Sequence, residues 1–203
     1  MIDVLDYGMG NSGSVIRMIE KVGGSARRIS TPEEIMCAHK LIIPGVGHFD
    51  SAMQLILTRG LLEPLRERLI NQGIPVLGIC LGMQLLCMHS EEGKLPGMGF
   101  VAAEVRKFIN LPNKPLKIPH MGWNEVKVVA NNSLINLTGD RSRFYFAHSY
   151  YVEPYSSDLI VATASYGVDF CAAFQSENIL GVQFHPEKSH RFGMALISRF
   201  VGL

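Results

Sequence analysis

The first half of the chain repeatedly places a short apolar stretch before a glycine-containing turn or a segment with helical periodicity. Three such stretches lie at residues 2–6, 41–43 and 75–79. They are largely apolar along their length, which is typical of strands buried on both faces of a parallel sheet. Parallel strands need crossover connections, and these are usually helices. The sequence therefore predicts an α/β fold with a mainly parallel central sheet and helices on both faces.

Glycine and proline residues indicate where these elements begin and end. Helices are expected over residues 14–22, 61–71 and 83–89, with a weaker strand over 26–29. Gly23 and Gly24 stop the first of these helices. Pro44 and Gly45 are expected to break the strand at 41–43.

The second half of the chain is rich in strand patterns and poor in helical ones. Strands are expected over residues 101–108, 125–129, 144–152, 159–164, 170–175 and 179–184, and a closing helix over 192–201. This arrangement predicts additional antiparallel strands, either in the same sheet or in a small second sheet. No repeat or linker divides the chain, so we expect one domain over residues 1–203.

The composition excludes several classes of protein. A chain of 203 residues can bury a core without disulfides or a structural metal. Hydrophobic residues make up 47% and charged residues 18%, which excludes intrinsic disorder. The net charge of +1 provides no electrostatic basis for binding nucleic acid or an anionic membrane.

The cysteines and the N-terminal residues indicate a compartment. The four cysteines form no CxxC pair, so we expect neither a disulfide framework nor a metal site. Asp3 and the lack of a basic leader argue against a signal peptide. No apolar run reaches the ~18 residues that span a bilayer. We therefore expect a cytoplasmic protein with reduced thiols.

Gly8, Gly10 and Gly13 have the spacing of a dinucleotide fingerprint, between a predicted strand and a predicted helix. The fingerprint also needs an acidic residue about 20 residues on, at the end of the second strand. Ile29 and Ser30 stand there instead. The motif is more simply interpreted as a turn in which glycine allows a close approach of the backbone.

A stronger pattern is Gly-Ile-Cys-Leu-Gly over residues 78–82. It has the spacing of a nucleophile elbow, with cysteine in place of serine, between a predicted strand and a predicted helix. Small residues two before and two after Cys80 are needed because the turn is tight. The amide groups beyond Cys80 would favour a thiolate and stabilise an oxyanion. The simpler alternative is a buried cysteine in a tight connection.

A nucleophilic cysteine needs a base, and the base needs a group that orients it. His185 and Glu187 supply both, because they follow an apolar strand pattern and are separated only by Pro186. Among the other histidines, three lie beside glycine or aromatic motifs and are further candidates to line a site: His48, His120 and His148.

These motifs carry a resemblance to a known family. The elbow, followed by Met83 and Gln84, together with His-Pro-Glu resembles the class I glutamine amidotransferases. Further motifs are similar to the glutaminase subunits of imidazole glycerol phosphate synthase: Asp-Tyr-Gly-x-Gly-Asn from residue 6, Pro-Gly-Val-Gly from 44, Pro-His-Met-Gly-Trp-Asn from 119, and Phe-Tyr-Phe-Ala-His-Ser-Tyr from 144. They run in family order from residue 6 to residue 189.

The resemblance implies the flavodoxin-like fold of this family and a cofactor-free glutaminase. Cys80 would attack the side-chain amide of L-glutamine, with His185 as acid and base and Glu187 as its partner. The implied oxyanion hole is formed by the backbone of Leu81 and of the turn Gly45, Val46 and Gly47. The implied substrate contacts are Gly47, Gln84, Ser149 and Tyr150.

The resemblance also implies a partner. Ammonia would pass to a separate cyclase subunit that makes imidazole glycerol phosphate and aminoimidazole carboxamide ribotide in histidine biosynthesis. That subunit is a (β/α)₈ barrel of about 250 residues, for which this chain has no room, so a heterodimer is expected. The residues implied at the interface or ammonia passage are Asn11, Trp123, Tyr145 and Lys188.

Alternatives remain open at this point. The flanks His48-Phe49-Asp50 and residues 190–193 are similar to paralogues that supply ammonia for surface-sugar amidination. A cysteine peptidase or γ-glutamyl hydrolase could use the same scaffold, although Gln84 and the turn at 44–47 argue against it. A non-catalytic dinucleotide-binding module is the remaining alternative.

Overall fold

One large mixed sheet organises the molecule. The computed structural model describes residues 1–109, 115–135 and 142–203. The strands are β1 (Ile2–Leu5), β2 (Ala26–Ile29), β3 (Leu41–Gly45), β4 (Val76–Cys80), β5 (His89–Ser90), β6 (Ala103–Lys107), β7 (His120–Val128), β8 (Ser142–His148), β9 (Tyr150–Pro154), β10 (Ile160–Tyr166), β11 (Val168–Ser176) and β12 (Ile179–Val182). Their order is β2-β1-β3-β4-β12-β11-β10-β7-β8, while β9 joins β11 to β6 and β6 pairs with β5.

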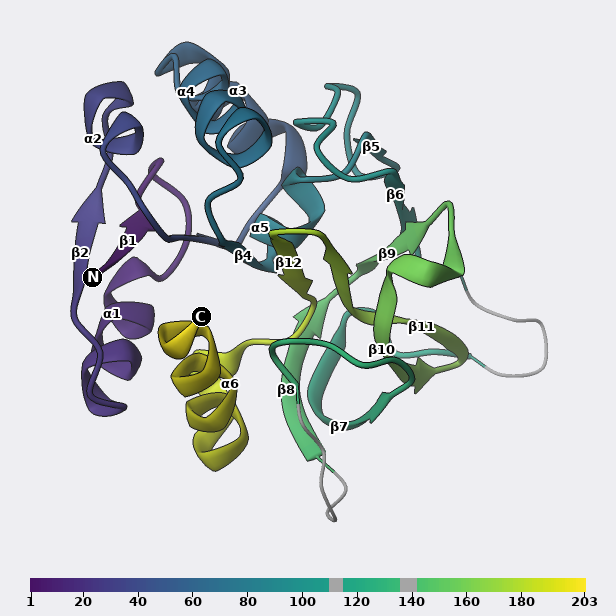
Figure 1. The fold of residues 1–203 in the computed structure, drawn as a ribbon. Coiled ribbons are helices and arrows are strands. Elements are labelled where there is room, and N and C mark those ends of the chain that lie inside the picture. The colour runs from purple at the N-terminus through teal and green to yellow at the C-terminus, as the bar shows by residue number, and fades with distance from the viewer. Residues whose placement is uncertain (110–114, 136–141) are drawn as a thin grey trace.

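The helices cover both faces of the parallel part of this sheet (Figure 1). They are α1 (Ser12–Lys21), α2 (Pro32–Met36), α3 (Phe49–Thr58), α4 (Leu62–Arg66), α5 (Leu81–Leu85) and α6 (His190–Gly202). A π-helical turn over Glu67–Asn71 continues α4, and 3-10 turns lie at Ser157–Leu159 and Pro186–Lys188. Helices α1 and α6 pack on one face, and α2, α3 and α4 lie on the other.

The two hydrophobic clusters show why the strands are apolar at consecutive positions. In β3, Leu41 and Ile43 belong to the cluster beneath α2 to α4, whereas Ile42 belongs to the cluster beneath α1 and α6. Successive side chains of a strand point to opposite faces. Strands β2, β1, β3 and β4 are parallel neighbours, as predicted, and β12 joins them in parallel although it was expected among the antiparallel strands.

The C-terminal strands extend the same sheet. Strand β11 pairs antiparallel with β12, and β10 and β7 follow it. The predicted antiparallel addition is therefore confirmed, as one mixed sheet with α/β architecture. Within the described ranges, no helix has the length and hydropathy that a membrane span requires.

Several predicted boundaries were wrong for identifiable reasons. Strand β3 continues through Pro44, because β1 ends at Leu5 and leaves that side of Pro44 without a strand partner. The stretch 144–152 forms two strands that separate at Ser149, because β8 pairs with β7 whereas β9 pairs with β6 and β11.

The helix predicted over 83–89 is α5, which starts at Leu81 and ends at Leu85. The chain beyond it pairs with the segment around residue 103 instead, through a bond from the Met88 amide to the Ala103 carbonyl. Helix α3 was not predicted at all. Strand β7 begins at His120 rather than at 125.

Candidate active site

Cys80 lies at the junction of β4 and α5 in a strained backbone conformation. Its φ of 53° and ψ of −110° lie outside the regions that a cysteine favours. Such strain persists only where the surroundings enforce it, and it is concentrated at functional sites. Cys80 is only 6% exposed, yet it lines a pocket. The chain therefore holds the thiol at the end of a sheet strand in a fixed direction.

The two glycines of the elbow are needed for this turn. A Cβ on Gly82 would collide with the carbonyl oxygen of Ile43 in the neighbouring strand. A Cβ on Gly78 would lie 2.8 Å from the Gly82 carbonyl oxygen and from Leu86. The predicted spacing of small residues thus has a direct steric cause.

His185 reaches Cys80 from the adjacent strand. Strand β12 pairs in parallel with β4 and ends at Val182, so His185 follows at the same edge of the sheet as Cys80. The His185 Nδ1 atom lies 2.8 Å from Glu187 Oε1, and both side chains are buried. The backbone amide of His185 donates to the Tyr145 carbonyl at 2.8 Å. The structure brings together the three predicted residues.

The protonation of His185 depends on its partners. Burial alone lowers the pKa of His185, but the interactions with Cys80 and Glu187 outweigh burial and raise the pKa well above 6.5. The imidazole is therefore able to stay protonated at the pocket. In this pair Nδ1 faces the carboxylate, which leaves Nε2 for the sulfur and for a leaving group.

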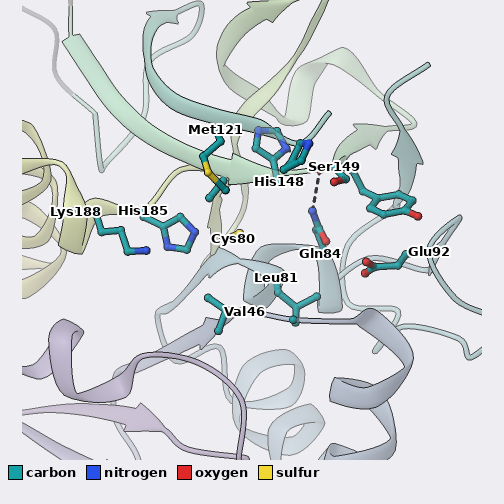
Figure 2. A pocket seen from close by; sticks show the side chains of 14 residues that line it. Val46, Cys80, Leu81, Gln84, Glu92, Met121, His148, Ser149, His185 and Lys188 are labelled. Atoms are coloured by element: carbon teal, nitrogen blue, oxygen red, sulfur yellow. Dashed lines mark hydrogen bonds between the residues drawn. The ribbon is translucent and has the colours of Figure 1, made fainter. Parts of the chain in front are cut away.

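A pocket of about 280 Å³ opens in front of Cys80 (Figure 2). Its lining contains the predicted catalytic residues Cys80 and His185 and the predicted interface residue Lys188. It also contains most of the predicted substrate and oxyanion residues, which are Val46, Gly47, Leu81, Gln84, Ser149 and Tyr150. Gly45 does not line it, because Gly45 is the β3 residue paired with Cys80. The volume suits a small-molecule ligand.

The Gln84 amide is held by two acceptors inside the protein. Its Nε2 donates to the Tyr150 carbonyl at 3.1 Å and to Gln183 Oε1 at 3.0 Å. The Gln183 Nε2 in turn lies 3.7 Å from Cys80 Sγ. Sequence reasoning missed Gln183, although a polar residue inside the apolar run at 179–184 was a signal that could have found it.

Two further residues of the pocket lining were missed. Glu92 lines the pocket and accepts a hydrogen bond at 2.9 Å from the amide of Phe49, so its carboxylate is fixed. Met121 also lines the pocket, and its side chain is 65% exposed. Glu92 lies in a charged surface stretch that no motif marks, and only the tertiary structure places it here.

The three other candidate histidines have different positions. His148 lines the pocket, and its Nδ1 lies 2.7 Å from the Tyr150 carbonyl. His120 lies behind His148 and contacts it at 3.0 Å. His48 is exposed and caps α3 by accepting a bond from the Asp50 amide. Burial lowers the pKa of His148 to about 3 and that of His120 to about 4.

Three of the residues predicted at a partner interface gather beside the pocket. Trp123 lies edge-on to Tyr145 at 6.3 Å and is stacked on His190 at 5.5 Å. The Lys188 Nζ lies 5.6 Å from the centre of the Tyr145 ring. Asn11 instead caps α1, because its Oδ1 accepts a bond from the Ser14 amide.

Known proteins resemble this chain over its whole length. The family model for glutamine amidotransferase class-I matches residues 3–202. The imidazole glycerol phosphate synthase subunit HisH 2 of Methanococcus maripaludis is 50% identical over 201 residues, covering 99% of this chain and 98% of that protein. The subunit HisH 2 of Pseudomonas aeruginosa is 44% identical over 203 residues, covering 100% of both.

Solved structures share the fold at low identity. A crystal structure of a glutamine amidotransferase matches with a TM-score of 0.74 and 17% identity, covering 100% of this chain and 99% of that one. The structure of PurLQS from Thermotoga maritima matches with a TM-score of 0.69 and 17% identity, covering 99% and 94%. At this identity the likeness supports the fold alone.

Proposed function

This chain belongs to the class-I glutamine amidotransferase family, and we propose that it is the glutaminase subunit of an imidazole glycerol phosphate synthase. It hydrolyses L-glutamine to glutamate and ammonia and delivers the ammonia to a separate cyclase subunit in histidine biosynthesis. The observation that carries the chemistry is that His185, paired with Glu187 at 2.8 Å, lines the same pocket as Cys80.

In the first half of the proposed reaction, the Cys80 thiolate attacks the side-chain carbonyl carbon of glutamine. The negative charge that develops on the amide oxygen is held by backbone N–H groups of Leu81 and of the turn at residues 45–47. Loss of one such donor typically costs about 10²–10³ in rate. His185 then gives its Nε2 proton to the leaving nitrogen, and ammonia departs as the C–N bond breaks.

In the second half, water hydrolyses the γ-glutamyl thioester. His185, now neutral, takes a proton from the water, and the oxygen attacks the thioester carbon. The C–S bond breaks, glutamate leaves, and the thiolate and imidazolium return. Glu187 orients His185 throughout by its bond to Nδ1. The steps need no metal and no cofactor.

Fixed polar groups of the pocket would bind the amino-acid end of glutamine. Both N–H bonds of Gln84 are engaged inside the protein, so its carbonyl oxygen is the group it offers to a ligand. The backbone at Ser149 and Tyr150 and at Gly47 supplies further partners. The negatively charged Glu92 carboxylate in the pocket lining would pair with the positively charged α-ammonium group of glutamine.

The partner would dock over the mouth of the pocket. Val46 is 44% exposed, Met121 65% and Trp123 40%. Large apolar side chains exposed beside a polar site mark an interaction surface. A (β/α)₈ cyclase covering them would receive ammonia past Tyr145 and Lys188, and Asn11 belongs to the same proposed interface. We place the complex in the cytoplasm, where the catalytic thiol stays reduced.

The test is glutamine hydrolysis by the chain alone and with its partner. The chain should be purified from its native source, the co-purifying synthase identified by mass spectrometry, and ammonia release measured with and without it. We expect release to be stimulated by a cyclase and to be lost in Cys80→Ala. A co-purifying sugar amidotransferase would instead identify the surface-sugar paralogue, and peptide cleavage without a partner would identify a peptidase.

A further inference from the structure

A chain of hydrogen-bonding groups leads from the pocket into the antiparallel part of the sheet. The His148 Nδ1 atom lies 2.7 Å from the Tyr150 carbonyl oxygen, and its Nε2 lies 3.0 Å from His120 Nδ1. The His120 Nε2 atom lies 3.3 Å from Asn124 Nδ2. The Asn124 amide also donates to the Ser165 carbonyl at 2.9 Å. The chain is thus bounded at each end by a backbone carbonyl.

The two carbonyls determine which nitrogen carries each proton. A carbonyl oxygen can only accept, so His148 must carry its proton on Nδ1. The His148 Nε2 then accepts, and His120 must donate to it from Nδ1. The His120 Nε2 is left to accept from Asn124. Only a pair of neutral imidazoles, each protonated on Nδ1, satisfies every contact in this chain.

The packing holds both rings in this arrangement. His120 is stacked between Tyr166, at 4.0 Å between ring centres, and Phe146, at 4.8 Å. The Phe108 ring lies 5.4 Å from His148. His120 is 4% exposed and does not line the pocket. Its side-chain contact with the pocket lining is therefore the hydrogen bond to His148.

The Tyr150 carbonyl connects this pair to the catalytic residues. It accepts from His148 and from Gln84, and Gln84 also donates to Gln183, which contacts Cys80. Tyr150 directly follows the break between β8 and β9 at Ser149. Ser149 and Tyr150, the residues at this break, line one wall of the pocket. The hydrogen bond that His148 donates to the Tyr150 carbonyl therefore orients this wall.

We propose that His120 is a positioning residue, which acts through His148 to hold the Tyr150 carbonyl and thereby the glutamine-binding wall. Its role rests on the proposed glutaminase function. It contributes to glutamine affinity and leaves the Cys80, His185 and Glu187 chemistry unchanged. No group in this chain of contacts needs to gain or lose a proton during turnover.

The main test compares two variants of His120 in the complex with its partner. His120→Phe keeps an aromatic ring between Tyr166 and Phe146 but removes the donor to His148. We expect it to raise KM for glutamine about tenfold, the size of one lost hydrogen bond, with kcat within about twofold. His120→Asn places an amide N–H where Nδ1 stood, and we expect KM within about threefold of wild type.

A matched control separates positioning from stability. Phe200→Leu removes a buried ring of the same hydrophobic cluster for which neither histidine is a ring partner, so we expect a lower melting temperature with KM unchanged. An unchanged KM in folded His120→Phe overturns the proposal, as does a loss of kcat alone. If the wild-type complex releases no ammonia from glutamine, the proposed function itself fails.

A second measurement needs neither activity nor a variant. Nitrogen-15 NMR of the histidine side chains in the wild-type protein at pH 7 reports which ring nitrogen carries the proton. We expect His120 and His148 both to be neutral and protonated on Nδ1. A charged ring or an Nε2-protonated ring at either position contradicts the chain of contacts, whether or not His120→Phe folds.

Discussion

Two histidines line the same pocket, and their surroundings shift their pKa values in opposite directions. His185 and His148 are both buried, and burial lowers the pKa of each. His185 faces a thiol and a carboxylate, which reverse the shift, whereas His148 faces a carbonyl and a neutral imidazole, which do not. The partners, rather than the depth of burial, set these opposite shifts, which fit the proposed roles of His185 in proton transfer and of His148 in positioning.

The largest predicted effect is the loss of the charged histidine. His185→Ala should lower kcat for glutamine hydrolysis by about 10⁴-fold, because the proposed reaction relies on His185 to protonate the leaving nitrogen. Ammonia release by the partner-bound protein measures this, and His148→Phe is the matched control with a much smaller loss of kcat. Equal losses of kcat in both variants would break the distinction between the two sites.

The next effect comes from removing the charge beside His185 without changing its shape. Glu187→Gln should lower kcat by about 10²-fold. The carboxylate helps to raise the pKa of His185, so its loss should move the alkaline limb of the kcat/KM profile to lower pH. The pH–rate profiles of the variant and the wild type measure the shift. An unmoved limb would contradict the role assigned to Glu187.

The lowered pKa values of His120 and His148 should affect how the stability of the protein depends on pH. In the unfolded chain, His120 and His148 become protonated below about pH 6.5. In the folded chain, burial lowers the pKa of His120 to about 4 and that of His148 to about 3. Stability should therefore fall as the pH drops from 6.5 towards 4, by up to about 1.4 kcal/mol per histidine and pH unit. His185 has the opposite sign, because its raised pKa gives stability that is present below pH 6.5 and lost as the pH rises towards its folded value.

Denaturant unfolding at pH 6.5 and pH 5.5 measures this slope. The double variant His120→Phe/His148→Phe should lose less stability between the two pH values than the wild type does, by about 2 kcal/mol. Identical slopes would mean that the two rings take up protons in the folded protein as readily as in the unfolded chain. That result would remove the contrast with His185.

The smallest effect concerns a histidine that belongs to neither site. His48→Ala should cost about 1 kcal/mol of stability, the usual cost of a lost helix cap, with no change in kcat or KM. Thermal unfolding and steady-state glutaminase assays measure both quantities. A change in KM would show that the pocket depends on α3 more strongly than the contacts of His48 indicate.

The parallel strands could be predicted because a strand that is buried on both faces has apolar residues at consecutive positions. Leu41, Ile42 and Ile43 are apolar because both faces of β3 are covered, and the pattern predicted a parallel strand. The break at Ser149 could not be predicted in this way. Residues 144–152 form a continuous strand pattern, and only the different neighbours of β8 and β9 divide it.

Residues whose geometry depends on their immediate neighbours in the chain could be recognised before any tertiary contact was known. Gly78 and Gly82 permit the strained turn at Cys80, and the spacing of His185 and Glu187 lets the two side chains meet. The tertiary structure decided which groups face them. Gln84 meets Tyr150 across 66 residues of sequence and Gln183 across 99, and His120 meets His148 across 28. Protonation follows from such contacts, because a pKa depends on burial and on partners that only the folded chain brings together.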